Sequence, residues 1–124
     1  MPMLKLSREF PKRGYIYIAD LDPGFGREIH KKRPVLVVSN NDSNRGTPYV
    51  VIIPSSSVIP ELISPDMVHI GKLKGLNKDS VLLPLFIRSI DKDRLVKKVR
   101  KLSQEKLFEI EEALKLVLNL EQLD

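Results

Sequence analysis

The sequence predicts a mainly β (α+β) fold: a small barrel of antiparallel strands followed by one C-terminal helix. Residues 34–40 and 49–53 are apolar on consecutive positions, as expected of strands that are buried on both faces. Two such strands fit a small closed barrel better than a flat sheet with one face in water. After Ser103 the apolar residues recur at helical spacing instead.

Three strands are predicted in the first half of the chain. Residues 15–21, YIYIADL, are rich in β-branched and aromatic side chains and stop at the turn sequence DPG. A long glycine-bearing loop over residues 22–33 leads to the second strand, 34–40. The turn-rich connection NDSNRGT, 41–47, leads to the third, 49–53, which Pro54 and three serines are predicted to close.

The second half holds weaker strand signals and one helix. Residues 58–64 and 67–73 are weak strand candidates, and 73–78 is predicted to be a basic loop. Residues 80–90, SVLLPLFIRSI, predict a stronger strand in which Pro84 marks an edge or a bulge.

The predicted helix starts after Ser103, a suitable N-cap residue, and has Glu105 in its first turn. Its apolar stripe, which should pack on the barrel, comprises Leu107, Ile110, Leu114, Val117 and Leu118.

Length and charge indicate one domain with a basic face. The 124 residues, of which 42% are hydrophobic, fit a single domain over 1–124 with a real core. The net charge is +5, and it is segregated along the chain: residues 72–106 hold eleven Lys and Arg against four Asp and Glu, whereas 107–124 hold one against five. This distribution is compatible with an anionic partner.

Several classes of site and location are disfavoured by composition. There is no cysteine, hence no disulfide or thiolate, and with only His30 and His69 we expect neither a metal nor a cofactor. Asp20 and Asp22 are interpreted as strand-end and turn carboxylates. The N-terminal segment lacks the apolar core of a signal peptide, and no run approaches the ~20 apolar residues of a membrane span. The expected compartment is the cytoplasm.

The stretch GREIHKKRPVLVVSN, residues 26–40, places a cluster of cations just before a buried strand. Proline disfavours the helical region for the preceding residue, so Arg33 should be extended, with its side chain fixed where the loop enters the strand. A phosphate-binding arginine gains from such anchoring, because its planar fork of donors is then oriented in advance. Arg33 is therefore the leading candidate for a phosphate contact.

The motifs, taken in order, resemble those of the MazF/PemK toxins. Residues 13–57, from RGYIYIADLDPGFG to YVVIIPSSS, follow the family's order of R-G-D and a strand, D-L-x-P, G-x-E, R-P, a valine-rich strand, an Asn/Asp-rich turn and a strand ending in threonine. The similarity continues less tightly through KDSVLLPLFIRSIDKDRL and the final helix, and covers roughly residues 12–120.

The resemblance implies a CcdB/PemK-like fold, a barrel related to SH3 folds with a terminal helix. It implies a homodimeric toxin of a type II toxin-antitoxin system: a metal-independent, sequence-specific endoribonuclease that cuts single-stranded RNA and is inhibited by an acidic antitoxin. The family's essential arginine corresponds to Arg33, and its essential threonine to Ser56.

The residues themselves suit this chemistry. A ribose 2′-hydroxyl can attack its own neighbouring phosphorus, so an enzyme needs only to orient the backbone and stabilise the added negative charge. Arg33 would supply fixed donors and Ser56 a further hydrogen bond. As an arginine is a poor general base, we interpret Arg33 as a stabiliser of charge.

Other residues of the loop are candidates for RNA binding. These are Glu28, His30, Lys31 and Lys32. Glu28 matches a common family glutamate but could instead pair with Lys31 or Lys32. His30 could stack on a base or donate to a phosphate, although an ordinary exposed loop histidine is the competing interpretation. The basic run at 97–101 is interpreted as a solvated surface.

The sequence departs from the family pattern at two places and leaves one main alternative open, besides the weaker one of a basic DNA-binding barrel, which no helix-turn-helix signal supports. Serine replaces threonine at Ser56, and Leu85-Phe86 replaces an acidic residue followed by glutamine that is associated with the RNA groove in relatives. The main alternative is a non-catalytic module of the same fold that binds DNA gyrase or only its antitoxin. Arg33 separates the two hypotheses, because a gyrase binder needs no arginine that faces a phosphate.

Overall fold

The computed structural model describes residues 9–120. Residues 1–8 and 121–124 lie outside the described part. The prediction that the N-terminal segment is not a signal peptide therefore falls largely on residues that are not described. The single domain over 1–124 therefore stays a prediction. Within residues 9–120, no helix is both long and apolar enough to cross a bilayer.

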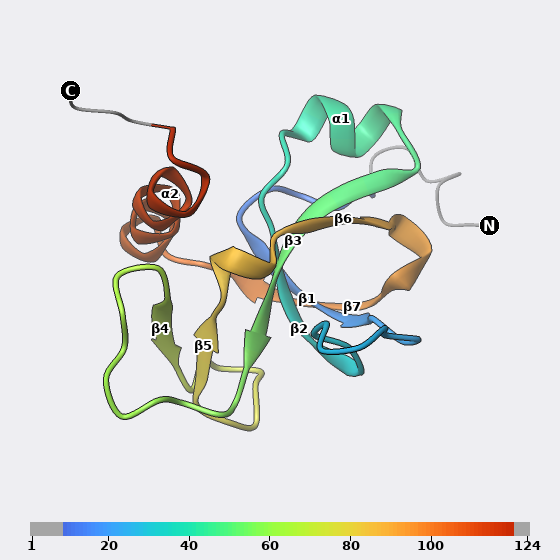
Figure 1. Ribbon diagram of the computed structural model, residues 1–124. Helices are drawn as coiled ribbons and strands as arrows, with labels where there is room; N and C mark the ends of the chain where they lie inside the picture. The colour runs from blue at the N-terminus through green and yellow to red at the C-terminus, as the bar shows by residue number, and fades with distance from the viewer. Residues whose placement is uncertain (1–8, 121–124) are drawn as a thin grey trace.

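Over residues 9–120, seven antiparallel strands curve into a half-barrel that carries one long helix at its side (Figure 1). The strands run in the order β4-β5-β3-β2-β1-β7, with β6 also paired to β3. They are β1 (Tyr15–Asp20), β2 (Lys32–Val37), β3 (Tyr49–Ser56), β4 (Val68–Gly71), β5 (Ser80–Leu82), β6 (Arg88–Asp91) and β7 (Leu95–Lys101). The predicted fold class, mainly antiparallel strands with a C-terminal helix, is confirmed.

Strand β3 pairs with three other strands and is longer than the sequence predicts. It continues through Pro54 to Ser56 instead of ending at residue 53. On one edge it pairs with β6 up to Ile52 and with β5 from Ser55 onward, so Pro54 lies at the changeover. The Pro54 nitrogen, which carries no hydrogen, points to the place where β6 gives way to β5, so no partner strand needs an N–H there. The Pro54 carbonyl on the same edge accepts from the Leu83 N–H at 2.9 Å. Proline therefore breaks no ladder here.

The predicted strand over 80–90 is in fact two strands, β5 and β6. Pro84 starts a short 3-10 helix, η2 (Pro84–Phe86), because its fixed φ suits a helical first turn. A second turn of this type, η3 (Lys92–Arg94), joins β6 to β7. The weak strand candidate at 58–64 is wrong. The basic run at 97–101 lies in strand β7, which pairs with β1, and its Lys and Arg side chains are exposed, as predicted.

The connection at 41–47 contains a helix that the sequence interpretation missed. Helix α1 (Asn41–Gly46) is capped by Asn40, whose side chain accepts from the Ser43 N–H at 2.8 Å. Asp42 and Arg45 lie at the helix ends that favour their charges. Asn, Asp and Ser favour both turns and N-caps, which explains the wrong assignment.

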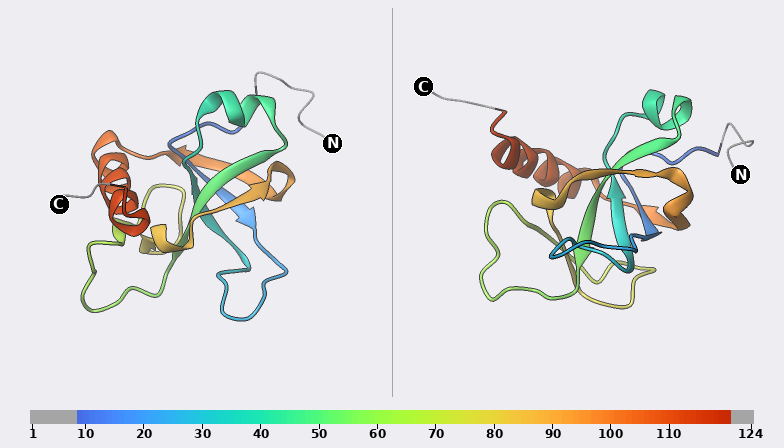
Figure 2. Two further views of the ribbon diagram at one scale, coloured as in Figure 1. Left: turned by 45° about the horizontal axis from the view of Figure 1, so that its top comes forward. Right: turned by 45° about the vertical axis from the view of Figure 1, so that its right-hand side comes forward.

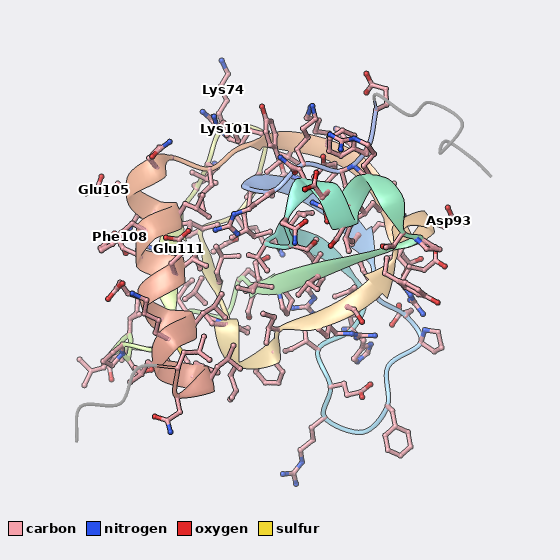
Figure 3. All side chains as sticks on the ribbon, turned by 90° about the horizontal axis from the view of Figure 1, so that it is seen from above. Lys74, Asp93, Lys101, Glu105, Phe108 and Glu111 are labelled. Atoms are coloured by element: carbon pink, nitrogen blue, oxygen red, sulfur yellow. The ribbon has the colours of Figure 1, made fainter. Side chains whose placement is uncertain are left out.

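The C-terminal helix α2 (Gln104–Leu118) is capped by Ser103 as predicted. Ile110 is buried and Leu107, Leu114 and Val117 are half-buried, but Leu118 is 46% exposed, so the predicted stripe is wrong only at its last residue. Glu105 and Phe108 point away from the sheet (Figure 3). Glu111 forms an ion pair with Arg13, which also donates to the Val38 carbonyl, and so ties the helix to the start of the sheet.

In the described part of the chain, the core consists of two clusters on opposite faces of the central strands. One lies between the sheet and α2 and contains Ile16, Leu36, Ile53 and Ile110. The other lies inside the half-barrel, on the side of β6, and its strand residues are Tyr17, Ala19, Val35, Val37, Val50, Ile52 and Ile90. Consecutive residues of β2 thus enter both clusters, as its apolar run predicts.

Candidate active site

Arg33 lies in strand β2, opposite Ala19 of β1, rather than at the end of the loop. Its side chain is anchored by two backbone carbonyls. Nε donates to the His30 carbonyl at 2.8 Å, and one terminal nitrogen donates to the Ser55 carbonyl of β3 at 2.9 Å. The guanidinium is therefore held across the junction of the loop, β2 and β3, as the proline that follows it suggested.

The anchored guanidinium keeps most of its donors. A guanidinium has five N–H groups, and the two contacts use two of them, so three remain for a ligand. Burial lowers the pKa of Arg33, and the charge of Asp22 opposes this effect. An arginine starts from so high a pKa that it stays charged in this environment.

The serines at the end of β3 have different roles. Ser55 is buried, and its hydroxyl donates to the Pro34 carbonyl at 2.7 Å, which ties β3 to β2. The side chain of Ser56 points to the opposite face of the sheet, and its hydroxyl accepts from the Val58 N–H at 3.0 Å. Among the described residues no hydrogen bond uses the Ser56 proton, so this hydroxyl can still donate.

Arg33 and Ser56 line one groove of about 450 Å³. Lys31 and Lys32 line it as well, and Lys78, from the loop before β5, adds a cation. Sequence reasoning missed Lys78 as a site residue, because the charge of the loop at 73–78 does not show that the loop folds against β2. Four cations thus surround a space with a serine hydroxyl, an arrangement suited to a nucleic-acid backbone.

The other two candidates, Glu28 and His30, lie away from this groove. Glu28 accepts from the Phe25 N–H at 2.9 Å rather than pairing with Lys31 or Lys32, and it lines a separate hollow with Phe86. The His30 ring bonds to Asp22, with Nδ1 and Oδ1 2.8 Å apart. The left-hand view of Figure 2 shows the loop that carries both residues extending from the end of β1.

The carboxylates of Asp20 and Asp22 are used within the loop. Asp20 accepts from the Asp22 N–H, and Asp22 accepts from the Lys31 N–H at 3.0 Å as well as contacting His30. Within residues 9–120 no three His, Cys, Asp or Glu side chains gather as a metal site would require. The positions where the family pattern has polar residues, Leu85 and Phe86, lie on η2 and are 63% and 36% exposed.

A family model described as "PemK-like, MazF-like toxin of type II toxin-antitoxin system" matches residues 12–118. The chain belongs to this family. It is 39% identical over 114 residues to "Endoribonuclease MazF" of Staphylococcus epidermidis, a match that covers 91% of this chain and 95% of that protein. It is 40% identical over 110 residues to "Endoribonuclease EndoA" of Bacillus subtilis, covering 88% and 95%.

A solved structure of a PemK/MazF-like relative supports the same assignment. "Endoribonuclease in complex with its cognate antitoxin from Mycobacterial species" superimposes with a TM-score of 0.73 at 27% identity, covering 91% of this chain and 99% of that one. The resemblance to MazF/PemK toxins and the predicted fold are thereby confirmed. The roles of Arg33, Ser56, Glu28, His30, Lys31 and Lys32 stay predictions.

Proposed function

We propose that this chain is the toxin of a type II toxin-antitoxin system and an endoribonuclease that cleaves single-stranded RNA in the groove beside Arg33. Two relatives that match most of the chain at about 40% identity are endoribonucleases. The observation that supports the site is the anchored guanidinium of Arg33, which keeps three N–H donors beside the free proton of Ser56. The proposed place of action is the cytoplasm, where RNA is available.

The proposed reaction uses the nucleophile of the substrate. The ribose 2′-oxygen attacks the adjacent phosphorus, a P–O bond forms, and the bond to the 5′-oxygen of the next nucleotide breaks. The 2′-hydroxyl loses its proton and the leaving 5′-oxygen gains one, so the products carry a 2′,3′-cyclic phosphate and a 5′-hydroxyl. Arg33 and Ser56 donate to the phosphate oxygens as negative charge develops on them. No metal ion is needed for this step.

The test is cleavage of a long, structure-free RNA with mapping of both new ends. Cyclic phosphate and 5′-hydroxyl ends, formed equally well with EDTA, are expected. RNA with a 2′-deoxy sugar at the cut site should bind and stay whole. Fragments with 5′-phosphate ends, or activity that needs magnesium, would contradict this mechanism.

Arg33 is tested with two substitutions. Arg33→Ala should lower kcat by about 10²–10³-fold, the cost of losing one donor to a developing oxyanion. Arg33→Lys should also be strongly impaired, because an ammonium cannot reproduce the planar fork. Expression of wild-type protein should arrest growth, and Arg33→Ala should relieve the arrest. Equal toxicity of a folded Arg33→Ala would favour the gyrase-binding alternative.

The proposed partners are an acidic antitoxin and a second copy of the chain. The similar mycobacterial endoribonuclease is solved with its cognate antitoxin, and the cations of the groove would attract carboxylates as they attract phosphates. A non-cleavable RNA and the antitoxin should therefore compete for the groove. The binding of each should weaken as the salt concentration rises. Simultaneous, independent binding would exclude a shared groove.

The homodimer is supported by large apolar side chains left exposed on the single chain. They include Val58, Leu62, Leu85 and Phe108. Burying such side chains between two copies would remove apolar surface from water. Light scattering at tens of micromolar should give the mass of a dimer, and a monomer alone would contradict the proposal.

A further inference from the structure

Arg33 depends on a single peptide group for its Nε contact. The acceptor is the carbonyl of His30, and the N–H on the other side of the same peptide bond belongs to Lys31. That N–H donates to Asp22 Oδ1 at 3.0 Å. Because the peptide is planar, Asp22 sets the direction in which the His30 carbonyl points, and hence where Arg33 finds its acceptor.

The backbone at Lys31 adopts a strained conformation that needs hydrogen bonds to stabilise it. Lys31 has a φ of 78°, in the left-handed region that costs a non-glycine residue about 1 kcal/mol or more. Two hydrogen bonds hold it there: the one to Asp22 and one from the Leu21 N–H to the Lys31 carbonyl at 3.0 Å. The carboxylate of Asp22 thus supports a strained backbone directly beside the proposed active site.

Asp22 is itself held in place from two sides. The His30 ring lies 2.8 Å from its Oδ1, and the ring packs so closely on Gly24 that an added Cβ there would lie 2.5 Å from the His30 Cβ. From the turn between β6 and β7, Arg94 donates to the carbonyls of Asp20 and Asp22 at 3.0 and 2.7 Å.

We infer that Asp22, oriented by His30, is a positioning residue for the RNA cleavage reaction: it fixes the His30–Lys31 peptide and through it the guanidinium of Arg33. This inference rests on the proposed function, in which Arg33 contacts the scissile phosphate. Both members of the Asp22–His30 pair are about half exposed, so the pair adds little to stability. Its effect is on the orientation of the catalytic fork, where a small displacement lowers the rate strongly.

The experiment compares Asp22→Ala with Asp22→Asn. Asp22→Ala should lower kcat about tenfold while KM for RNA changes less than about twofold, because the cations that bind the backbone remain. Asp22→Asn should recover most of the rate, since its side-chain oxygen can still accept from the Lys31 N–H. Asp42→Ala, which removes an exposed carboxylate on α1, is the matched control and should leave kcat unchanged.

A double-substitution cycle shows whether Asp22 acts through Arg33. Lysine has no Nε–H to donate to the His30 carbonyl, so in an Arg33→Lys background Asp22→Ala should have almost no further effect. An equal tenfold loss in both backgrounds, or an Asp22→Asn as poor as Asp22→Ala, would overturn the inference.

The two proposals fail in different ways. If Arg33→Ala lowers kcat as expected but Asp22→Ala keeps the wild-type kcat, only the positioning role is wrong. If Arg33→Ala cleaves RNA normally, the proposed function of Arg33 is wrong and the positioning role fails with it.

Discussion

Strand β2 and the loop before it meet at Lys32, next to Arg33, yet they are held by different interactions. Val35, Leu36 and Val37 are completely buried, and their contacts are apolar packing. Residues 22–28 are exposed, and the loop is held by hydrogen bonds of the Asp22 and Glu28 carboxylates. The strand thus supplies stability, whereas the loop supplies the geometry of the site. Substitutions on the two sides should therefore separate folding from activity.

The largest effect should come from the strand. Leu36→Ala would leave a cavity in the cluster beneath α2 and lower the free energy of unfolding by about 2–5 kcal/mol. Urea denaturation measures this change. Leu120→Ala, at a position that is 67% exposed after α2, is the control and should stay within about 0.5 kcal/mol of wild type. Similar losses for both variants would show that the packing described for β2 is not what stabilises the fold.

The two serines at the end of β3 allow the sharpest comparison. Ser56→Ala should raise the barrier to cleavage by about 1.5–3 kcal/mol, because it removes a hydrogen bond to a charged oxygen, and should hardly change stability. Ser55→Ala should do the reverse, lowering stability by about 1 kcal/mol through the lost bond to the Pro34 carbonyl. Single-turnover cleavage measures the loss of rate expected for Ser56→Ala, and thermal unfolding measures the loss of stability expected for Ser55→Ala.

Ser56→Thr refines that comparison. Threonine keeps the hydroxyl and restricts its rotamer, so activity should be retained. If Ser56→Ala cleaves as fast as wild type, or if Ser55→Ala is the one that loses catalysis with an intact fold, the assignment of the two serines is wrong.

The sequence predicted the strand side of this comparison well and the loop side less well. Apolar runs predict buried strands because packing depends on side-chain character, which the sequence displays directly. Pro34 likewise predicts an extended Arg33, because the restriction is local. The left-handed Lys31 and the contact of Asp22 with its N–H depend on how the loop closes, which no local pattern displays.

Two further differences between local pattern and spatial arrangement have the same origin. Pro54 suggests the end of a strand, and only the change of partner from β6 to β5 shows why the strand continues. Glu28 and His30 also lie near Arg33 in sequence, but their side chains bond to the Phe25 N–H and to Asp22 and do not line the groove, and their RNA-binding roles stay predictions. Proximity along a loop is a weak guide to proximity in space.

A smaller effect is expected from the loop backbone. Lys31→Gly should stabilise the protein by about 0.5 kcal/mol, because glycine adopts a positive φ without strain but gains freedom in the unfolded chain. Lys32→Gly, one residue later in the extended strand β2, should destabilise by about 0.5–1 kcal/mol. Thermal unfolding of this pair tests whether the strain lies at Lys31, and destabilisation by both would show that it does not.

The smallest effect should be the pH dependence that comes from Asp22. The hydrogen bond from His30 is the main cause that lowers the pKa of Asp22 below its ordinary value of 3.8; burial opposes it, and the bond from the Lys31 N–H adds to the lowering. The folded state then binds this proton less tightly than the unfolded state does. Asp22 therefore contributes stability above pH 3.8, and that contribution is lost as the pH falls through the lower, folded pKa. Because the carboxylate is exposed, the contribution is small and weakens with salt.

The measurement is the difference in melting temperature between wild type and Asp22→Asn, followed from about pH 6 down to about pH 2.5 at low salt. Asn cannot titrate, so the advantage of the wild type should shrink on acidification and approach a constant once Asp22 is protonated. Leu36→Ala in strand β2 is the contrast. It changes no titrating group, so the difference between its melting temperature and that of the wild type should not show this pH dependence. A wild-type advantage that grows below pH 3.8 would mean that the folded loop favours protonated Asp22, and the hydrogen bonds to His30 and Lys31 would then not stabilise its charge as described.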